Sequence, residues 1–300
     1  MNRRRFLSIS AAAFVAGPAL AAPALTRIRG QALGTGVQIL LAHPDADAMG
    51  RRALAEIARL EAIFSLHRES DLARLNRAGH IPAPPPELLD CLSLAAHLHQ
   101  ATGGLFDPTI QPLWRLHAER HAAGAPPSAS EIAAAQRLVG WERVEFGTDG
   151  VRLAPGMALT LNGIAQGYIA DRIAALLGAE GLTDVLVDTG ELVAPGVQPD
   201  GRGWPVALAG GQGSVMLRQA ALASSAPLGT TFDALGAAGH ILDPRTGTPA
   251  PARWRLVSVT APSAAVADAA STAFCLMNRQ EIGQALRALP SCHIIALRAA

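Results

Sequence analysis

The sequence has few aromatic residues and no excess of charge of either sign. Aromatic side chains make up 4% of the 300 residues, and 25 basic residues are balanced by 24 acidic ones. There is no basic stripe and no basic patch interleaved with aromatics, so the usual signatures of a nucleic-acid-binding protein are missing. We therefore expect no nucleic acid among its partners.

Cysteine is also scarce. Cys91, Cys275 and Cys292 form no C-x-x-C motif, and their odd number leaves at least one without a disulfide partner within the chain. Cys91 and Cys275 lie in apolar patterns with helical spacing, which favours buried, unreactive thiols. The sequence therefore predicts structural rather than reactive cysteines.

The N-terminal apolar segment is short and follows a cluster of arginines. Arg3–Leu7 is a twin-arginine pattern, and Ala19–Ala21 offers an A-x-A cleavage site. The alternative is a membrane anchor, which is less favoured because Gly17 and Pro18 interrupt a short run. We expect residues 1–21 to be an export signal and the mature protein to be periplasmic.

The remaining residues mix strand and helix patterns without a regular βαβ alternation. Strand patterns cover residues 38–41, 159–161, 184–187, 256–260 and 293–297. Helical patterns with capping or stop signals cover residues 46–64, 86–102, 129–139, 164–177, 263–277 and a segment after Asn278. The sequence predicts one α+β domain over residues 22–300, with mixed, mainly antiparallel sheets and packed helices.

Asp268 and Thr272 are four residues apart in a predicted helix, so both side chains lie on one face. A carboxylate and a hydroxyl are hard oxygen ligands that suit Mg²⁺, which completes its octahedron with phosphate oxygens and water. The alternative is an early-helix aspartate favoured by the helix dipole, with Thr272 bonding back to its own helix.

The turn Asn162-Gly163-Ile164 lies between a strand pattern and a helix pattern. A glycine there lets the backbone approach a ligand closely, and the helix N-terminus favours a bound phosphate. An ordinary strand-to-helix turn is the alternative interpretation.

Two further turns carry candidate functional residues. Gly103–Thr109 contains Phe106, an apolar surface, and Asp107, a hydrogen-bond acceptor. His240–Gly247 begins with His240, whose imidazole is suited to act as a general base near neutral pH. Taken alone, the first is a capped turn with a core phenylalanine, and the second is a hairpin with a structural histidine.

These segments, together with Gly34-Thr35 and Ser65–Asn76, occur in an order that resembles the ApbE family, the FAD:protein FMN transferases. The resemblance implies an enzyme that uses Mg²⁺ and FAD to attach FMN to a threonine or serine of a partner protein. It implies the fold of that family, and acceptors that are flavin-carrying subunits of membrane electron-transfer complexes. The sequence of residues Thr160–Gly167 resembles the same segment in family members that are linked to nitrous-oxide-reductase maturation.

The resemblance also assigns roles to individual residues. It implies that magnesium is held by Asp268, Thr272, the Gly163 carbonyl and Ser271. It implies that His240 removes the acceptor proton, with Asp243 positioning it or supporting the metal. The implied contacts to FAD come from eight further residues: Leu33, His67, Leu105, Phe106, Asp107, Thr160, Gln166 and Leu242.

The sequence departs from the family pattern at several flavin contacts. Leu33 replaces a methionine, and His67 stands where an aromatic residue is usual. Thr160 replaces an acidic residue, and Gln166 replaces Lys or Glu, so neither carries charge. Two other functions therefore stay open: a non-catalytic FAD-binding assembly factor for a periplasmic redox complex, and an FAD pyrophosphatase in which water replaces the acceptor.

Three other patterns are set aside. His117 and His121 have metal spacing but lack the H-E-x-x-H motif. The glycines at 210, 211 and 213 lack the lysine of a P-loop, and no G-x-S-x-G elbow is present. The sequence gives no indication of oligomeric state.

Overall fold

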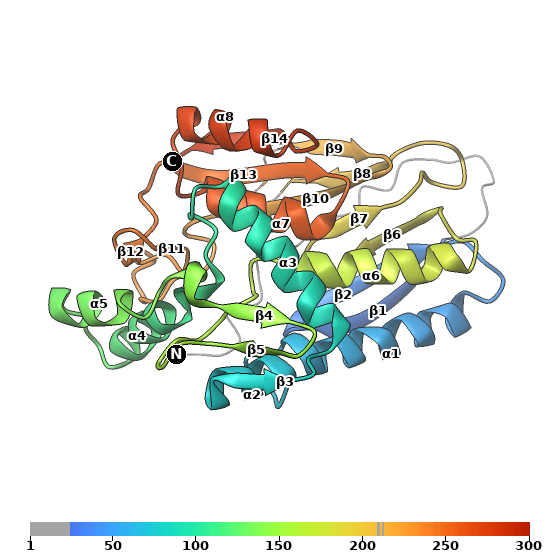
Figure 1. Ribbon diagram of the computed structural model, residues 1–300. Coiled ribbons are helices and arrows are strands. Elements are labelled where there is room, and N and C mark those ends of the chain that lie inside the picture. Colours follow the sequence, from blue (N-terminus) through green and yellow to red (C-terminus); the bar gives the residue numbers. More distant parts are fainter. Residues whose placement is uncertain (1–24, 209–210, 212) are drawn as a thin grey trace.

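A seven-stranded sheet, in which all neighbouring strands are antiparallel, organises the chain (Figure 1). Its strand order is β1-β2-β6-β7-β10-β13-β14. The computed structural model describes residues 25–208, 211 and 213–300. The predicted export signal at residues 1–21 lies outside the described residues.

Fourteen strands are assigned within the described residues. They are β1 (Thr26–Ala32), β2 (Thr35–Leu41), β3 (His80–Pro82), β4 (Glu145–Gly147), β5 (Gly150–Arg152), β6 (Val185–Asp188), β7 (Leu192–Ala194), β8 (Trp204–Ala207), β9 (Ser214–Leu217), β10 (Ala220–Ser225), β11 (Leu242–Asp243), β12 (Thr248–Pro249), β13 (Trp254–Ala261) and β14 (His293–Ala299).

The helices lie mainly on one side of the main sheet. They are α1 (Ala46–Phe64), α2 (Asp71–Ala78), α3 (Pro86–Ala101), α4 (Gln111–Ala122), α5 (Ala129–Gln136), α6 (Ala165–Ala179), α7 (Ala264–Phe274) and α8 (Arg279–Ala288), with 3-10 turns η2 (Pro108–Ile110) and η3 (Trp141–Arg143). Among the described residues, no helix is both long enough and apolar enough to span a membrane.

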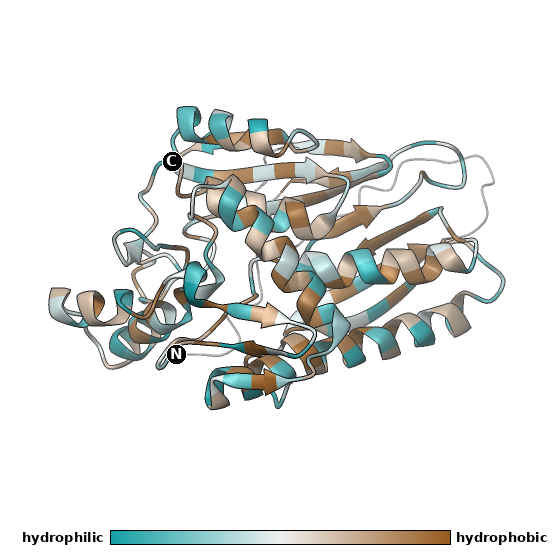
Figure 2. Cartoon of the chain, viewed as in Figure 1, coloured by the Kyte–Doolittle hydropathy of each residue, from teal (hydrophilic) through white to brown (hydrophobic). Residues whose placement is uncertain are grey.

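Alternate residues of the central strands enter two different cores, because successive strand side chains point to opposite faces. Ile39 and Leu41 of β2 pack under the helices, whereas Leu40 packs with Trp204 and Leu217 of the β8–β9 ribbon. The same alternation runs through β6, β10 and β13. Figure 2 shows these strands in hydrophobic colours and the outward turns of α1 and α8 in hydrophilic ones. Both faces of the sheet are therefore covered.

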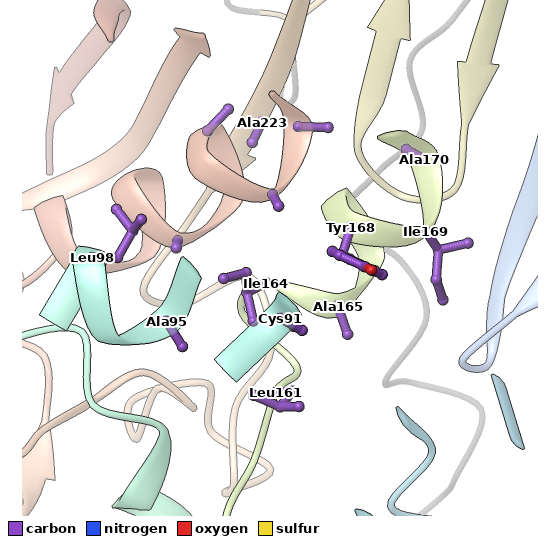
Figure 3. Packing of buried hydrophobic residues seen from close by; sticks show 14 of the residues in the cluster. Cys91, Ala95, Leu98, Leu161, Ile164, Ala165, Tyr168, Ile169, Ala170 and Ala223 are labelled. Carbon is purple, nitrogen blue, oxygen red and sulfur yellow. The ribbon is translucent and has the colours of Figure 1, made fainter. Parts of the chain in front are cut away.

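Helices α6 and α7 meet through small residues, close to the buried side of α3 (Figure 3). A Cβ atom on Gly167 would lie 2.3 Å from the carbonyl oxygen of Ala264, so only glycine allows this approach. Asp171 of α6 also caps α7: it accepts bonds from the Ser263 hydroxyl (2.7 Å) and from the backbone N–H groups of Ala264 (2.8 Å) and Ala265 (3.0 Å). The start of α7 is thereby fixed against α6.

The α+β prediction is confirmed, and so are several local ones. Ser128 and Asn278 each form the predicted capping box, with Glu131 and Glu281. Ser263 caps α7 as part of the predicted helix, which ends at Phe274, three residues earlier than expected. All three cysteines are buried and free, which confirms the burial predicted for Cys91 and Cys275.

The predicted strand at residues 159–161 is wrong. Residues 159–161 belong to no strand among the elements assigned in the described residues. Their backbone groups bond elsewhere: the Asn76 side chain accepts from the Leu159 N–H (2.7 Å) and donates to the Leu159 carbonyl (2.8 Å), and the Thr160 N–H donates to the Pro108 carbonyl (2.8 Å). A side-chain amide and a turn thus replace the ladder that an extended segment usually requires.

Candidate active site

One cavity brings together most of the residues that the sequence analysis selected. It opens between the β1–β2 turn, the segment at 65–67, the turn at 105–108, the start of α6, and α7. Twelve of the fourteen predicted site residues line it: Leu33, His67, Leu105, Phe106, Asp107, Thr160, Gly163, Gln166, His240, Leu242, Asp268 and Thr272. These residues span more than 230 positions of sequence, so the fold, not local spacing, assembles the cavity.

Asp268 and Thr272 form the polar floor of the cavity together with the Gly163 turn. Asp268 is 4% exposed, and its carboxylate accepts a long bond from the Gly167 N–H (3.4 Å). A Cβ atom on Gly163 would lie 3.3 Å from the Thr272 hydroxyl oxygen, so the turn passes directly beside α7. A carboxylate, a hydroxyl and a backbone turn therefore line the same cavity.

Glu191, which sequence reasoning missed, is a second buried carboxylate lining this cavity. The Ser224 N–H donates to it at 3.3 Å. Burial raises the pKa of Asp268 to about 8, and burial together with the charge of Asp268 raises the pKa of Glu191 well above its usual value. Glu191 follows a fully buried strand in the run Asp188-Thr189-Gly190, and polar residues directly after such a strand were the available signal.

Within the part of the chain that the structure describes, neither carboxylate has an ion-pair partner. A buried carboxylate is costly unless a positive charge compensates it. No group of three or more His, Cys, Asp and Glu side chains is placed to hold a metal among these residues. A cation here would have to draw on hydroxyl, carbonyl and ligand oxygens as well, which matches the preferences of Mg²⁺.

Two predicted residues do not line the cavity. Ser271 is fully buried, where its hydroxyl contacts the Asp268 carbonyl (3.0 Å) and the Ser225 hydroxyl (2.7 Å). Asp243 accepts from the backbone and guanidinium of Arg245, which closes its own turn. Ser271 thus lies behind Asp268, and Asp243 stabilises the hairpin that follows His240.

His240 lines the cavity, and one of its two ring nitrogens is hydrogen-bonded to the backbone. Its Nδ1 lies 3.0 Å from the Thr230 carbonyl oxygen, which can only accept, so Nδ1 carries the proton in the neutral ring. Nε2 is then the basic nitrogen. Burial lowers the pKa of this imidazole, which keeps it neutral at physiological pH. The arrangement is that of a general base held in one tautomer.

Apolar side chains and short turns form the other end of the cavity. Leu33 and Gly34 both have positive φ (47° and 82°) in the two-residue turn between β1 and β2, a conformation unfavourable for leucine. Leu105 and Phe106 are buried, while His67 is exposed at the rim. Apolar walls with few directional groups suit a planar aromatic ligand.

Asp107, Gln166 and Thr160 add polar groups to this end. Asp107 caps η2 by accepting from the Thr109 N–H (2.8 Å) and hydroxyl (2.6 Å). Gln166, in the first turn of α6, donates to the Thr35 hydroxyl (2.8 Å). The Thr160 hydroxyl accepts from the Asn162 N–H (3.3 Å). Each is held by neighbouring protein groups at the cavity edge.

Comparison with known proteins places this chain in one family. The model of the ApbE family matches residues 33–296. The chain is 26% identical to an FAD:protein FMN transferase of Klebsiella pneumoniae over 90% of this chain and 83% of that protein. It is 30% identical to an FAD:protein FMN transferase of Treponema pallidum over 80% of this chain and 77% of that protein.

Solved structures give the same result. The apo form of the flavinyl transferase ApbE of Pseudomonas stutzeri superposes with a TM-score of 0.80 at 25% identity, over 94% of this chain and 97% of that one. The ApbE protein of Thermotoga maritima superposes with a TM-score of 0.81 at 25% identity, over 92% and 97%. The chain belongs to the ApbE family.

Proposed function

We propose that this protein is an enzyme that transfers FMN from FAD to a threonine or serine hydroxyl of a partner protein and releases AMP. The observation that carries the proposal is the arrangement within one cavity. A histidine whose Nε2 is the basic nitrogen and the carboxyl groups of Asp268 and Glu191 line the same cavity as the apolar side chains of Leu33, Leu105, Phe106 and Leu242. The names of the relatives in the ApbE family support the same activity.

The donor set fits Mg²⁺. Asp268 supplies a buried carboxylate, Thr272 a hydroxyl and Gly163 a backbone carbonyl, and the remaining positions suit phosphate oxygens and water. Glu191 places a second carboxyl group in the same cavity, while the hydroxyls of Ser271, on α7, and Ser225 are hydrogen-bonded to each other. When bound, Mg²⁺ would supply charge neutralisation on the pyrophosphate of FAD.

His240 acts on the acceptor. Its Nε2 takes the proton from the threonine or serine hydroxyl as that oxygen bonds to the phosphorus nearer the flavin. The bond from this phosphorus to the bridging oxygen breaks, and AMP leaves with that oxygen. The Thr230 carbonyl holds the ring in the required tautomer throughout, so the basic nitrogen needs no rearrangement.

The flavin occupies the apolar end of the cavity in this proposal. Leu33, Phe106 and Leu242 provide its walls, and His67 closes the rim. Gln166 and Thr160 offer uncharged hydrogen-bonding groups, with Asp107 and Leu105 at the turn beneath. The protein would carry out this reaction in the periplasm after twin-arginine export, on flavin-carrying subunits of membrane electron-transfer complexes.

Incubation with FAD, Mg²⁺ and an acceptor domain tests the proposal, with intact mass of the acceptor and chromatography of free nucleotides as readouts. We expect the acceptor to gain one FMN phosphoester while AMP appears in equal amount. AMP with free FMN and an unmodified acceptor would instead establish a pyrophosphatase. FAD binding without any AMP would establish a non-catalytic binder, and either result would overturn the transferase.

A further inference from the structure

The segment that delivers His240 to the cavity also carries the most exposed large hydrophobic side chain in the described residues. Residues 230–240 form a short hairpin: Thr231 bridges Gly239, the Phe232 N–H donates to the Ala238 carbonyl (2.8 Å), and the His240 N–H donates to the Thr230 carbonyl (3.1 Å). Leu235, at its tip, is 93% exposed. Thr230 and His240, at its base, line the cavity.

The hairpin is firmly attached to the body of the protein. Phe232 is 5% exposed and packs among the rings of Trp114, His117 and His121, with centroid distances of 5.4, 5.5 and 5.9 Å. One aromatic residue of the hairpin is thus buried, and the leucine three residues later is left in solvent. An unpacked leucine is not needed for the stability of this hairpin.

The tip itself is preformed. The Asp233 carboxylate accepts from the N–H groups of Ala237 (3.0 Å) and Ala238 (2.9 Å), and Gly236 supplies the left-handed conformation that the turn requires (φ 76°). A turn held by side-chain caps loses little conformational freedom when it is covered, so little of the contact energy is lost to ordering.

A second exposed leucine lies at the hairpin base. Leu228 is 50% exposed, and a Cβ atom on Gly239 would lie 3.4 Å from its Cδ2 atom. Leu228 therefore sits beside the residue that precedes His240. Single exposed apolar residues are common on protein surfaces, but here one lies beside the residue that precedes His240 and the other at the tip of the hairpin that ends at His240.

We propose that Leu235 and Leu228 form a docking surface for the acceptor protein, which rests on them through apolar side chains close to its target threonine or serine. This inference depends on the proposed function, because the acceptor is defined by that reaction. The hydroxyl must come within bonding distance of the basic nitrogen of His240, which brings the polypeptide around it close to the segment that carries His240. Burial of apolar surface beside the site would supply affinity without disturbing the cavity.

Serine substitutions test the docking surface. The probe is the recombinant soluble domain of a flavin-carrying electron-transfer subunit, and its affinity is measured by biolayer interferometry with and without FAD and Mg²⁺. We expect Leu235→Ser to weaken acceptor binding and raise its KM about tenfold, the scale of a typical interface anchor, with kcat and FAD affinity unchanged. Leu228→Ser should act in the same direction.

Met216→Ser is the matched control, because Met216 is 51% exposed on β9 and does not line the cavity. It should leave acceptor binding and KM at wild-type values. Equal acceptor binding by wild type and both leucine variants would overturn the docking surface. A wild-type protein that binds the acceptor through Leu235 yet never labels it would support docking and overturn the proposed transfer, so the two failures are distinguishable.

Discussion

The two ends of the cavity are built differently. The acidic end consists of Asp268 and Thr272 on α7, the Gly163 turn before α6, and Glu191 next to β7, all attached to helices or the main sheet. The apolar end, which we propose binds the flavin and call the flavin end, consists of turns and a rim segment around Leu33, residues 65–67 and residues 105–107. The carboxylates of the first are buried, and His67 of the second is exposed.

This difference matches the demands of the two proposed tasks. Positioning a cation and a reacting phosphate requires fixed charges, and regular elements packed around Gly167 and capped by Asp171 hold them. Contact with a flat ring requires mainly apolar surface, which different side chains can supply. The departures from the family pattern at Leu33 and His67 fall at the flavin end, where different side chains can supply the same apolar surface. No departure falls on Asp268 or Thr272.

The largest effect is expected from Asp268→Asn, which removes the buried charge at the acidic end but keeps its shape. Transfer should fall by about a thousandfold or more, because the pyrophosphate charge is left uncompensated. The apo variant should be at least as stable as wild type, since the substitution relieves an unpaired buried carboxylate. Single-turnover kinetics measure the transfer rate, and thermal unfolding measures the stability of the apo variant. Near-wild-type transfer would remove Asp268 from the site.

His240→Ala should slow transfer by about a hundredfold, the usual scale for a lost general base, with FAD affinity kept. Because burial lowers the pKa of His240 in the folded protein, the wild-type rate should persist below the ordinary imidazole pKa of about 6.5 before falling with acid. Rates at saturating FAD across a pH series check this. An unchanged rate and acid limb in the variant would place the base elsewhere.

Gly167→Ala tests whether the packing of α6 against α7 supports the acidic end. The added Cβ would lie 2.3 Å from the Ala264 carbonyl oxygen, so the helices must separate, at a cost of about 3 kcal/mol of unfolding free energy. Gly178→Ala is the matched control in the same helix, since its Cβ would meet nothing within 4 Å. Urea unfolding should show Gly178→Ala stabilised by about 0.5 kcal/mol. Equal stability of both variants would contradict the packing argument.

The smallest effect belongs to the flavin end. His67→Ala removes an exposed rim side chain that we expect to stack on the flavin, so FAD affinity should weaken by about fivefold, within the range for one exposed ring contact. The rate at saturating FAD should not change. Fluorescence titration with FAD measures the affinity, and single-turnover kinetics measure the rate at saturating FAD. A loss of rate without a loss of affinity would assign His67 to the chemistry instead.

The sequence predicted the residues whose partners are local. The four-residue spacing of Asp268 and Thr272 and the capping boxes at Ser128 and Asn278 depend on helical periodicity alone. Glu191 was missed because its significance depends on Asp268, 77 positions away, and on burial that no local pattern encodes. The strand prediction at 159–161 was wrong for the same reason, because Asn76, which lies on a helix far away in the sequence, bonds to the Leu159 backbone.

The family motifs include residues whose roles local chemistry leaves ambiguous. His240 could have been a structural hairpin residue, and only the 3.0 Å contact of Nδ1 with the Thr230 carbonyl shows which nitrogen is basic. Ser271 and Asp243 share motifs with site residues, yet the structure directs the first into the core and the second toward Arg245. Membership of a motif thus did not by itself place a side chain in the cavity.

Calorimetric comparison of FAD and riboflavin, with Mg²⁺ and with EDTA, tests the division of the cavity most directly. In the proposed arrangement riboflavin would occupy only the flavin end, whereas FAD would also place its pyrophosphate over Asp268, Thr272 and Gly163. The account predicts that FAD binds more tightly than riboflavin in Mg²⁺, and that EDTA removes most of the difference while leaving riboflavin unaffected. Equal affinities for both ligands under both conditions would contradict it.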